Sequence, residues 1–268
     1  MSSYTGNIQT VPKASLSDNV RRDRGRSPVS SATQKAGGMT FFSMPQTWYT
    51  PAMLGQPEKT VYLVRHGQSE GNVAPVFQPL DSPLSFLGKE QARLIAERVS
   101  KLSFETLISS PLPRARGTAE AISTATGRTI EYCDLFTERM KPSNLDGKSY
   151  GDPEAHMLWR TWEESLHTSG ARAEDGENFD DIIERADKAL EFLKGRSEQS
   201  LVVVTHGFFL RTMVARVLLG DTLSPESFRK LQSSMEMENT GLTVLNYEER
   251  WNGPGWMIWT YNDHAHLG

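Results

Sequence analysis

Residues 201–207 have the sequence LVVVTHG, and residues 63–67 have the sequence LVRHG. Each is a short apolar run, rich in β-branched residues, that ends at a glycine, which predicts two buried β-strands. Apolar residues at helical spacing occur between such runs, most clearly in residues 88–102 and 177–195. Apolar strands that alternate with helices indicate a mainly parallel sheet covered on both faces. We therefore expect an α/β fold, a three-layer α/β/α sandwich.

The rest of the chain continues this alternation. The first strand is expected to begin at Lys59 and to end at Arg65. The other expected elements are strands at 105–109, 128–132, 241–247 and 256–261, and helices that begin at Pro113 and that span 153–168 and about 208–219. The chain shows no internal repeat, so a repeat architecture is not expected.

Composition indicates a soluble protein of a reducing compartment. The 268 residues include one cysteine, Cys133, which excludes a disulfide framework and any multi-cysteine metal site. No apolar run approaches the roughly 18 residues that span a bilayer. The N-terminal sequence MSSYTGNIQT also lacks the apolar core of a secretory signal. We expect a cytoplasmic protein that has no membrane partner.

Charge is divided unevenly along the chain. Residues 1–57 carry six basic and two acidic side chains, which leaves 23 basic and 31 acidic ones for the remainder. The acidic remainder argues against nucleic acid as a partner. Residues 1–38 are basic, rich in serine and poor in aliphatic side chains, which predicts a disordered tail. Residues 39–57 hold four aromatic side chains among prolines and are expected to form an extended arm.

The tail has several interpretations. An inert solvated segment is the simplest one, because charge-rich tails are commonly solvated. The alternatives are a regulatory segment, a phosphorylation target, and an Arg/Ser-rich transit peptide that directs the protein to an organelle. No sequence feature indicates the oligomeric state.

Two of the predicted strands end in the same way, with a histidine followed by a glycine. His66 ends the first of them, and His206 ends the most strand-like run of the chain. In parallel sheets the chemistry lies at the carboxyl ends of the strands. Arg65 precedes the first histidine, and Arg114 begins a helix just past another strand end. Two histidines, two arginine forks and a helix N-terminus at one sheet edge predict a phosphate pocket.

Five sequence blocks resemble the successive signatures of the histidine phosphatase superfamily, which has the phosphoglycerate mutase-like fold. They are LVRHGQSEGN (63–72), DSPLSFLGKEQA (81–92), SSPLPRARGTAE (109–120), TER (137–139) and VVTHG (203–207). The closing segment WTYNDHAHL (259–267) also resembles the C-terminal strand and tail of many phosphatase members. RHG alone is a weak signal, but five blocks in order are specific. Residues 58–268 are therefore expected to form a histidine phosphatase domain.

The resemblance implies which residues carry the reaction. His66 is expected to be the nucleophile that forms a phosphohistidine. Glu138 is expected to be the general acid that protonates the leaving oxygen and then activates water. Should Glu138 not fill this role, Asp134 and Asp146 are the next candidates, because they flank the same loop.

The resemblance also implies which residues bind the phosphoryl group. Arg65, Arg114 and His206 are expected to bind its oxygens and to stabilise the transition state. Asn72 is expected to add a polar contact, and Gly207 is expected to take part in substrate binding at the strand end. Because the two arginines supply positive charge, neither a metal nor another cofactor is expected.

Two departures from the family pattern bear on the reaction. Residue 68 is Gln where many members carry an acid, a change that should leave the phosphate site intact. The segment after Glu138 is RMKPSNLDG, whereas phosphoglycerate mutases resemble ERHYG there, with a tyrosine and basic groups for the substrate carboxylate. We therefore expect hydrolysis of a small phosphorylated metabolite, with mutase-type phosphotransfer as the alternative. Specificity is expected in the insert 141–177, with Trp159 and Trp162 placed in the core rather than in a pocket wall.

Three other functions compete with this one. A non-catalytic protein that binds a phosphorylated ligand would normally lack a catalytic residue, and none is missing. Residues 67–71 (GQSEG) fit the G-x-S-x-G motif of serine hydrolases with Ser69 as nucleophile, but prolines follow where the motif requires a helix. His264 and His266 could place two metal ligands on one face of a strand, yet a packed or solvated chain end is the favoured interpretation.

Overall fold

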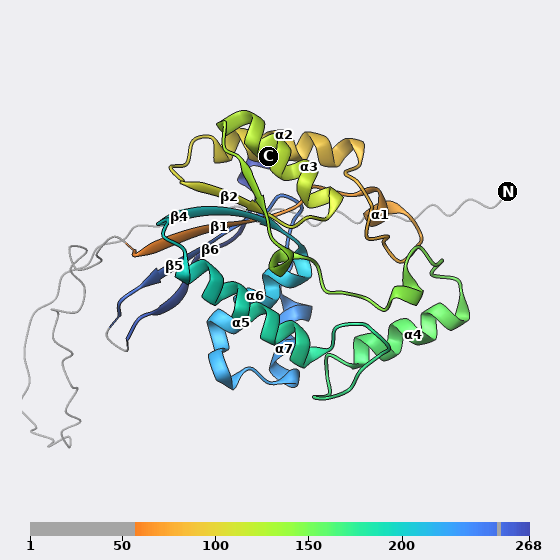
Figure 1. Ribbon diagram of the computed structural model, residues 1–268. Coiled ribbons are helices and arrows are strands. Elements are labelled where there is room, and N and C mark those ends of the chain that lie inside the picture. The colour runs from red at the N-terminus through yellow and green to blue at the C-terminus, as the bar shows by residue number, and fades with distance from the viewer. Residues whose placement is uncertain (1–56, 251–252) are drawn as a thin grey trace, which may run out of the picture. The chain divides into compact units, whose positions relative to one another are not determined.

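The computed structural model describes residues 57–250 and 253–268 and contains a six-stranded sheet (Figure 1). The predicted tail, and all of the predicted arm except residue 57, lie outside the described residues. The strand order is β3-β2-β4-β1-β5-β6, and β5 runs antiparallel to both of its neighbours while the others share one direction. The strands are β1 (Lys59–Arg65), β2 (Thr106–Ser109), β3 (Ile130–Tyr132), β4 (Ser200–Thr205), β5 (Leu242–Glu248) and β6 (Gly255–Asp263). The mainly parallel sheet is confirmed.

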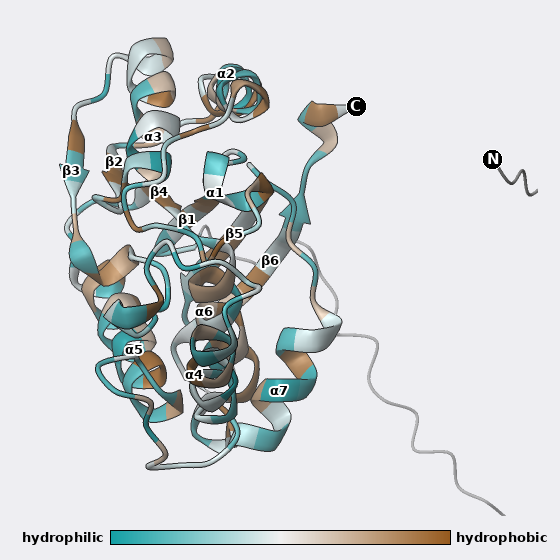
Figure 2. Ribbon diagram, turned by 90° about the vertical axis from the view of Figure 1, so that its right-hand side faces the viewer, coloured by the Kyte–Doolittle hydropathy of each residue, from teal (hydrophilic) through white to brown (hydrophobic). Residues whose placement is uncertain are grey.

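Helices cover both faces of the sheet, which confirms the three-layer α/β/α sandwich (Figure 1, Figure 2). α2 (Phe86–Val99) and α3 (Pro113–Thr126) lie on one face, and α5 (Phe179–Gly195) and α6 (Gly207–Leu219) lie on the other. The other helices are α1 (Glu70–Val73), α4 (Pro153–Glu164), α7 (Pro225–Ser234) and the 3-10 turns η3 (Asp134–Phe136), η4 (Ser143–Leu145), η5 (Gly220–Thr222) and η6 (Ala265–Leu267). No helix within the described ranges is long and apolar enough to cross a bilayer.

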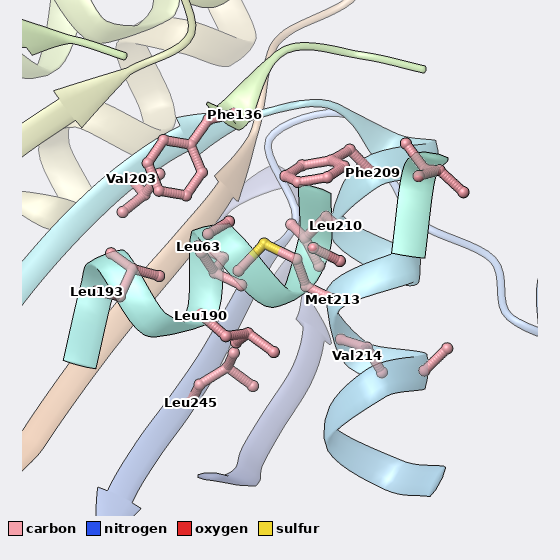
Figure 3. Packing of buried hydrophobic residues seen from close by; sticks show 14 of the residues in the cluster. Leu63, Phe136, Leu190, Leu193, Val203, Phe209, Leu210, Met213, Val214 and Leu245 are labelled. Atoms are coloured by element: carbon pink, nitrogen blue, oxygen red, sulfur yellow. The ribbon is translucent and has the colours of Figure 1, made fainter. Parts of the chain in front are cut away.

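The alternation of side chains along the strands divides the core into two clusters. Leu63 of β1 and Val203 of β4 pack with α5 and α6 (Figure 3). Val64 and Val202, one residue along from each of them, pack with α2 and α3 on the opposite face. Because both faces of these strands are buried, the strands are apolar throughout, which is the pattern that the sequence shows.

α7 and α4 differ from the sequence-based expectation. α7 was not predicted, because Phe228 is its one buried residue and its apolar periodicity is therefore weak. Its start is nevertheless well specified, since Ser224 accepts a hydrogen bond from the Ser227 amide and Pro225 occupies the first turn. α4 ends at Glu164, earlier than the predicted 168, because Arg139 donates to the Trp162 carbonyl oxygen and takes the place of a further helical amide.

α4 and α1 lie at the same end of the molecule (Figure 1). α4 packs in a small cluster of its own, with Phe77, Leu145 and Ala155 buried and Trp159 packed against them. A backbone hydrogen bond of 2.8 Å from the Phe77 amide to the Lys148 carbonyl oxygen ties together the two loops that carry this cluster. The cluster therefore stands apart from the two main core clusters.

Candidate active site

His66 follows β1 directly and is almost completely buried. Its Nδ1 lies 2.7 Å from the carbonyl oxygen of Gly67, an acceptor, so we assign the ring proton to Nδ1. Its Nε2 accepts a hydrogen bond of 3.3 Å from Nε of Arg114. The ring therefore presents the unprotonated lone pair of Nε2 toward the Arg114 guanidinium.

The backbone around His66 is held by several partners. The His66 amide donates to the Thr205 carbonyl oxygen at 2.9 Å. The His66 carbonyl oxygen accepts from the Asn239 side-chain amide at 3.0 Å. The Gly67 amide donates to the Thr118 hydroxyl at 3.0 Å. The three partners come from three separate parts of the chain, so the direction of the imidazole is set by the fold.

His206 lies at the end of β4, beside His66, with the two ring centroids 4.9 Å apart. Its Nε2 is 2.8 Å from the Ser110 hydroxyl, and that hydroxyl accepts a bond from the Leu112 amide. We assign the hydroxyl as the donor to His206 Nε2, which leaves the ring proton on Nδ1. This Nδ1 is buried and lacks a hydrogen-bond partner in the described part of the chain. A buried donor without a partner is unfavourable, so Nδ1 is positioned for an acceptor from outside the chain.

Arg65 and Arg114 bring two guanidinium groups to the same place. Arg65 donates to the Met237 carbonyl oxygen through Nη1, while its buried Nε has no partner among the residues described. Arg114, in the first turn of α3, is 3% exposed. Within residues 57–250 and 253–268 neither arginine forms an ion pair with a carboxylate. Two largely buried cations without a counterion indicate an anion site.

Gly207 makes room for this arrangement. A Cβ built on Gly207 would lie 3.0 Å from Nε of Arg65, closer than side chains normally approach. Gly207 also begins α6, so the helix N-terminus faces the same region. The position of Gly207 beside Arg65 is the structural basis for its predicted place in the binding site.

Burial and positive charge keep both histidines neutral. Burial, and then the charges of Arg114 and Arg65, hold the pKa of His66 well below its ordinary value. Burial, followed by the charge of Arg114, likewise holds the pKa of His206 well below the ordinary value. At neutral pH the Nε2 lone pair of His66 is therefore available to an electrophile.

Glu138 places its carboxylate at the N-terminus of α6. Its Oε1 accepts from the Phe209 amide at 3.0 Å, and its Oε2 accepts from the Phe208 amide at 3.3 Å. The negative charge of Glu138 acts to raise the pKa of both Arg65 and Arg114, against the lowering by burial. The structure thus brings Glu138 together with the predicted phosphate-binding residues.

The loop that carries Glu138 is held by Arg185 of α5. The Arg185 guanidinium donates to three carbonyl oxygens within residues 135–138 and pairs with Glu177 at 2.7 Å. The two alternative acids lie elsewhere. Asp134 is exposed, and Asp146 pairs with Lys141 at the surface. Neither of them lines the cavity described next, whereas Glu138 does.

A cavity of about 600 Å³ adjoins these residues. Most of its wall is aromatic or apolar, and Arg114 and Glu138 also line it. Its lining residues are Phe77, Gln78, Leu80, Arg114, Glu138, Arg139, Lys141, Tyr150, His156, Trp159 and Trp162. Trp159 and Trp162 therefore line a cavity, and the prediction that they lie in the core is wrong. The insert 141–177 turns them toward the cavity because α4 packs on the loops around Phe77 rather than on the sheet.

The hydrogen bonds of Asn72 do not place its side chain beside His66 or His206. Its side chain is exposed, and its Oδ1 accepts from the Ser69 amide at 3.0 Å, a bond that caps α1. Its Nδ2 lies 3.4 Å from the Gln78 side chain, which lines the cavity. The predicted contact of Asn72 with a phosphoryl group stays a prediction.

Ser69 has the wrong surroundings for a serine nucleophile. The one-turn helix α1 does begin right after it, contrary to the expectation from the prolines, but its hydroxyl is completely buried. The hydroxyl accepts from the Gln78 amide at 2.5 Å rather than from a histidine. A nucleophilic serine needs an adjacent base, so this geometry does not support a serine hydrolase.

The two C-terminal histidines pack separately. His264 Nδ1 is 2.8 Å from the Asn262 carbonyl oxygen, and His266 Nε2 is 3.0 Å from the Thr240 hydroxyl. In the described ranges no group of three or more His, Cys, Asp or Glu side chains is arranged to hold a metal ion. The favoured interpretation of this segment, a packed chain end, agrees with these contacts.

Comparison with known proteins assigns the family. The model of the histidine phosphatase superfamily (branch 1) matches residues 61–263. The chain belongs to this superfamily. It is 32% identical over 216 residues to the probable phosphoglycerate mutase GpmB of Photorhabdus laumondii, a match that covers 77% of the chain and 94% of that relative. Phosphatase- or mutase-type activity follows from membership of the superfamily.

Solved structures show the same relationship. YhfR of Bacillus stearothermophilus is similar with a TM-score of 0.66 and 25% identity, over 78% of this chain and all of that one. A mycobacterial glucosyl-3-phosphoglycerate phosphatase in complex with VO3 is similar with a TM-score of 0.59 and 25% identity, over 76% of this chain and 99% of that one. The phosphoglycerate mutase-like fold expected from the resemblance is therefore confirmed for this superfamily member.

Sequence reasoning about this histidine phosphatase superfamily member missed the residues that hold the predicted ones in place. Ser110 lies within the SSPLPRARGTAE block and could have been singled out there. Thr118 lies in the same block. Asn239 and Arg185 lie in segments without any motif, so no sequence signal points to them. Their roles depend on contacts between residues that are far apart in the chain.

Proposed function

We propose that this protein hydrolyses phosphate monoesters through a phosphohistidine on His66. The observation that carries the proposal is that the unprotonated Nε2 of His66 lies at the same place as two buried nitrogens that lack partners in the described ranges. His66 Nε2 faces Arg114 at 3.3 Å, and the buried nitrogens Arg65 Nε and His206 Nδ1 have no partner in the described residues. A phosphoryl group has the charge and the oxygens that these donors require.

The first step transfers the phosphoryl group to the enzyme. Nε2 of His66 attacks phosphorus, the P–N bond forms, and the bond from phosphorus to the leaving oxygen breaks. Arg65, Arg114 and the Nδ1 proton of His206 stabilise the charge that collects on the other phosphoryl oxygens. The Nδ1 proton of His66 stays hydrogen-bonded to the Gly67 carbonyl oxygen, which holds Nε2 in line.

Glu138 is proposed to handle the proton in both steps. In its protonated form it gives a proton to the leaving oxygen as the alcohol departs. The resulting carboxylate then takes a proton from water as that water attacks phosphorus, the P–N bond breaks and inorganic phosphate is released. Its place in the cavity wall beside Arg114 supports this role, because the cavity offers the leaving group room next to the carboxyl group.

Hydrolysis is favoured over mutase chemistry by the residues that follow Glu138. A phosphoglycerate mutase must hold the carboxylate of its substrate. Arg139 and Lys141 are the basic residues of this segment, and each already pairs with a carboxylate of the chain, Glu163 and Asp146 respectively. The similarity to a probable phosphoglycerate mutase makes mutase activity the alternative.

Trapping the intermediate tests the proposal. Acid-labile, base-stable phosphoryl label is expected on wild type quenched during turnover of a 32P-labelled monoester, and none is expected on His66→Ala. The His66→Ala variant should keep the circular dichroism spectrum of the wild type while losing phosphate release. Acid-stable label, or conversion of 3-phosphoglycerate to 2-phosphoglycerate without phosphate release, would contradict hydrolysis through His66.

Because the arginines supply positive charge, EDTA should not lower the rate.

A further inference from the structure

We infer that the cavity beside Glu138 binds the leaving group, and that the substrate is the phosphate monoester of an uncharged alcohol carrying an aromatic ring or a similarly flat apolar group. This inference rests on the proposed function, because it assigns the other half of the same site. It depends on the aromatic side chains of the cavity wall and on the pairing of Arg139 and Lys141 with carboxylates of the chain.

The wall is a continuous row of aromatic side chains. The Phe77 ring meets the Tyr150 ring edge-on, with centroids 4.8 Å apart, and lies 6.4 Å from the Trp159 ring. Trp159 in turn lies 5.6 Å from the His156 ring. Tyr150 is 50% exposed and His156 is also exposed, so both ends of the row reach the solvent while Phe77 between them is buried. Aromatic rows of this kind bind flat apolar groups through edge and stacking contacts.

Trp162 forms a second, fixed part of the wall. The Arg139 guanidinium lies 3.7 Å from the centre of its ring, and its Nε1 donates to the Glu177 carbonyl oxygen at 3.1 Å. A Cβ built on Gly176 would lie 2.7 Å from the same ring. The indole is therefore held in one orientation before any ligand arrives, which reduces the entropy lost on binding.

The cations of the wall are already paired. Arg139 pairs with Glu163 at 3.1 Å, and its other nitrogens donate to backbone oxygens and to Ser165. The Lys141 ammonium pairs with Asp146, and the lysine side chain is only 11% exposed. Among the described residues of this wall, a carboxylate on the leaving group would therefore meet no unpaired lysine or arginine beyond Arg114, which faces His66.

Three phosphate monoesters with the same type of leaving oxygen test this inference. 3-Phenylpropyl phosphate, n-propyl phosphate and 3-phosphoglycerate all release a primary alcohol. From the apolar area of one ring, kcat/KM for 3-phenylpropyl phosphate should exceed that for n-propyl phosphate by about tenfold or more. 3-Phosphoglycerate should be hydrolysed no faster than n-propyl phosphate. A preference for 3-phosphoglycerate would overturn the inference and leave the proposed hydrolysis standing, whereas no phosphate release from any ester would contradict the proposed function.

Variants of the cavity wall test whether the preference for the phenyl ester arises in this cavity. Trp159→Ala, and Tyr150→Ala at the rim in case Trp159→Ala fails to fold, should lower the phenylpropyl-to-propyl ratio of kcat/KM at least fivefold. Trp259→Ala is the matched control, because Trp259 is 62% exposed on β6 and does not line the cavity. An unchanged ratio in a folded cavity variant would show that the ring binds elsewhere, and would overturn the inference.

Asp146→Asn tests the pairing of the cations. Asparagine keeps an oxygen for the Leu80 amide, which donates to Asp146 at 3.1 Å, but it leaves the Lys141 ammonium without a counterion. The ratio of kcat/KM for 3-phosphoglycerate to that for n-propyl phosphate should rise severalfold. Asp134→Asn, on an exposed acid outside the cavity, should not change this ratio. A ratio that stays the same in Asp146→Asn would contradict the pairing argument.

Discussion

The two ends of the active site are built from different parts of the molecule. The phosphate end consists of strand ends and helix starts, with Arg65 and His66 at the end of β1 and His206 at the end of β4. The aromatic cavity is walled by loops and by α4, whose apolar cluster is separate from the two main core clusters. The groups proposed to react thus lie at the edge of the sheet, and the groups proposed to select the substrate lie on segments that can vary without disturbing it.

Glu138 lies where the two ends meet, and its replacement should have the largest effect. Glu138→Gln keeps the size of the side chain but cannot deliver a proton. The phosphorylation step should slow by about 10²–10⁴ for an alkyl phosphate, which needs a proton on its leaving oxygen. The loss should be much smaller for para-nitrophenyl phosphate, whose leaving group departs as a stable anion.

Single-turnover rapid quench measures this difference. The first step must be isolated because Glu138 is also proposed to activate the water that cleaves the phosphohistidine. Asp134→Asn serves as the control and should leave both rates close to wild type. Equal losses on both esters would move the acid to another residue and would separate Glu138 from the leaving-group side.

Gly207→Ala tests how closely the phosphate end is packed. The added methyl group would lie 3.0 Å from Arg65 Nε and should displace that guanidinium. A full ångström of misplacement costs about 10²-fold in turnover, so a shift of the Arg65 side chain by a few tenths of an ångström should cost up to that, and the loss should be the same for every ester. The control is Gly195→Ala, where a Cβ would meet nothing within 4 Å. Steady-state kinetics on two esters decide the matter, and a loss confined to one of them would contradict the division between the two ends.

Gly176→Ala is the corresponding change on the cavity side. Its methyl group would lie 2.7 Å from the Trp162 ring and should shift the indole. We expect KM for 3-phenylpropyl phosphate to rise by about tenfold, the order of effect of a small change in an apolar pocket, with a smaller change for n-propyl phosphate. Titration of the variant with both esters measures the difference, and equal changes would show that Trp162 acts on the phosphate end as well.

The smallest expected effect concerns the buried histidines and pH. Because the pKa of His66 and that of His206 are lowered by burial from the ordinary 6.5, the folded state binds fewer protons than the unfolded chain below that pH. The free energy of unfolding should therefore be fully retained above about pH 6.5 and should fall with decreasing pH. The slope is up to about 1.4 kcal/mol per pH unit for each histidine.

Urea unfolding of ligand-free protein at pH 7.5, 6.5 and 5.5 measures this slope. His206→Gln removes one titrating group, so its free energy of unfolding should depend less steeply on pH over the same range. Identical slopes in the wild type and the variant would mean that His206 is not held neutral by its surroundings. The aromatic end provides the contrast, since Trp159→Ala should change the stability by the same amount at each pH.

Much of this protein is determined by its sequence alone. β1 and β4 are apolar on both faces, so their burial and the positions of His66 and His206 at their ends follow from a local pattern. The order of the five blocks then assigns the superfamily, and it places Arg65, Arg114 and Glu138 near the histidines. These conclusions succeed because short motifs and strand periodicity act within a few residues of the chain.

Only the tertiary structure decided how the site is held and what surrounds it. Ser110 contacts Nε2 of His206, and Arg185 holds the loop of Glu138, through contacts between distant segments. Trp159 lines the cavity rather than the core because α4 packs on the Phe77 loop, which amphipathic spacing cannot reveal. α7 escaped prediction because it buries only Phe228. Contacts of this kind depend on which segments the fold brings together, and that information is not contained in any short stretch of the chain.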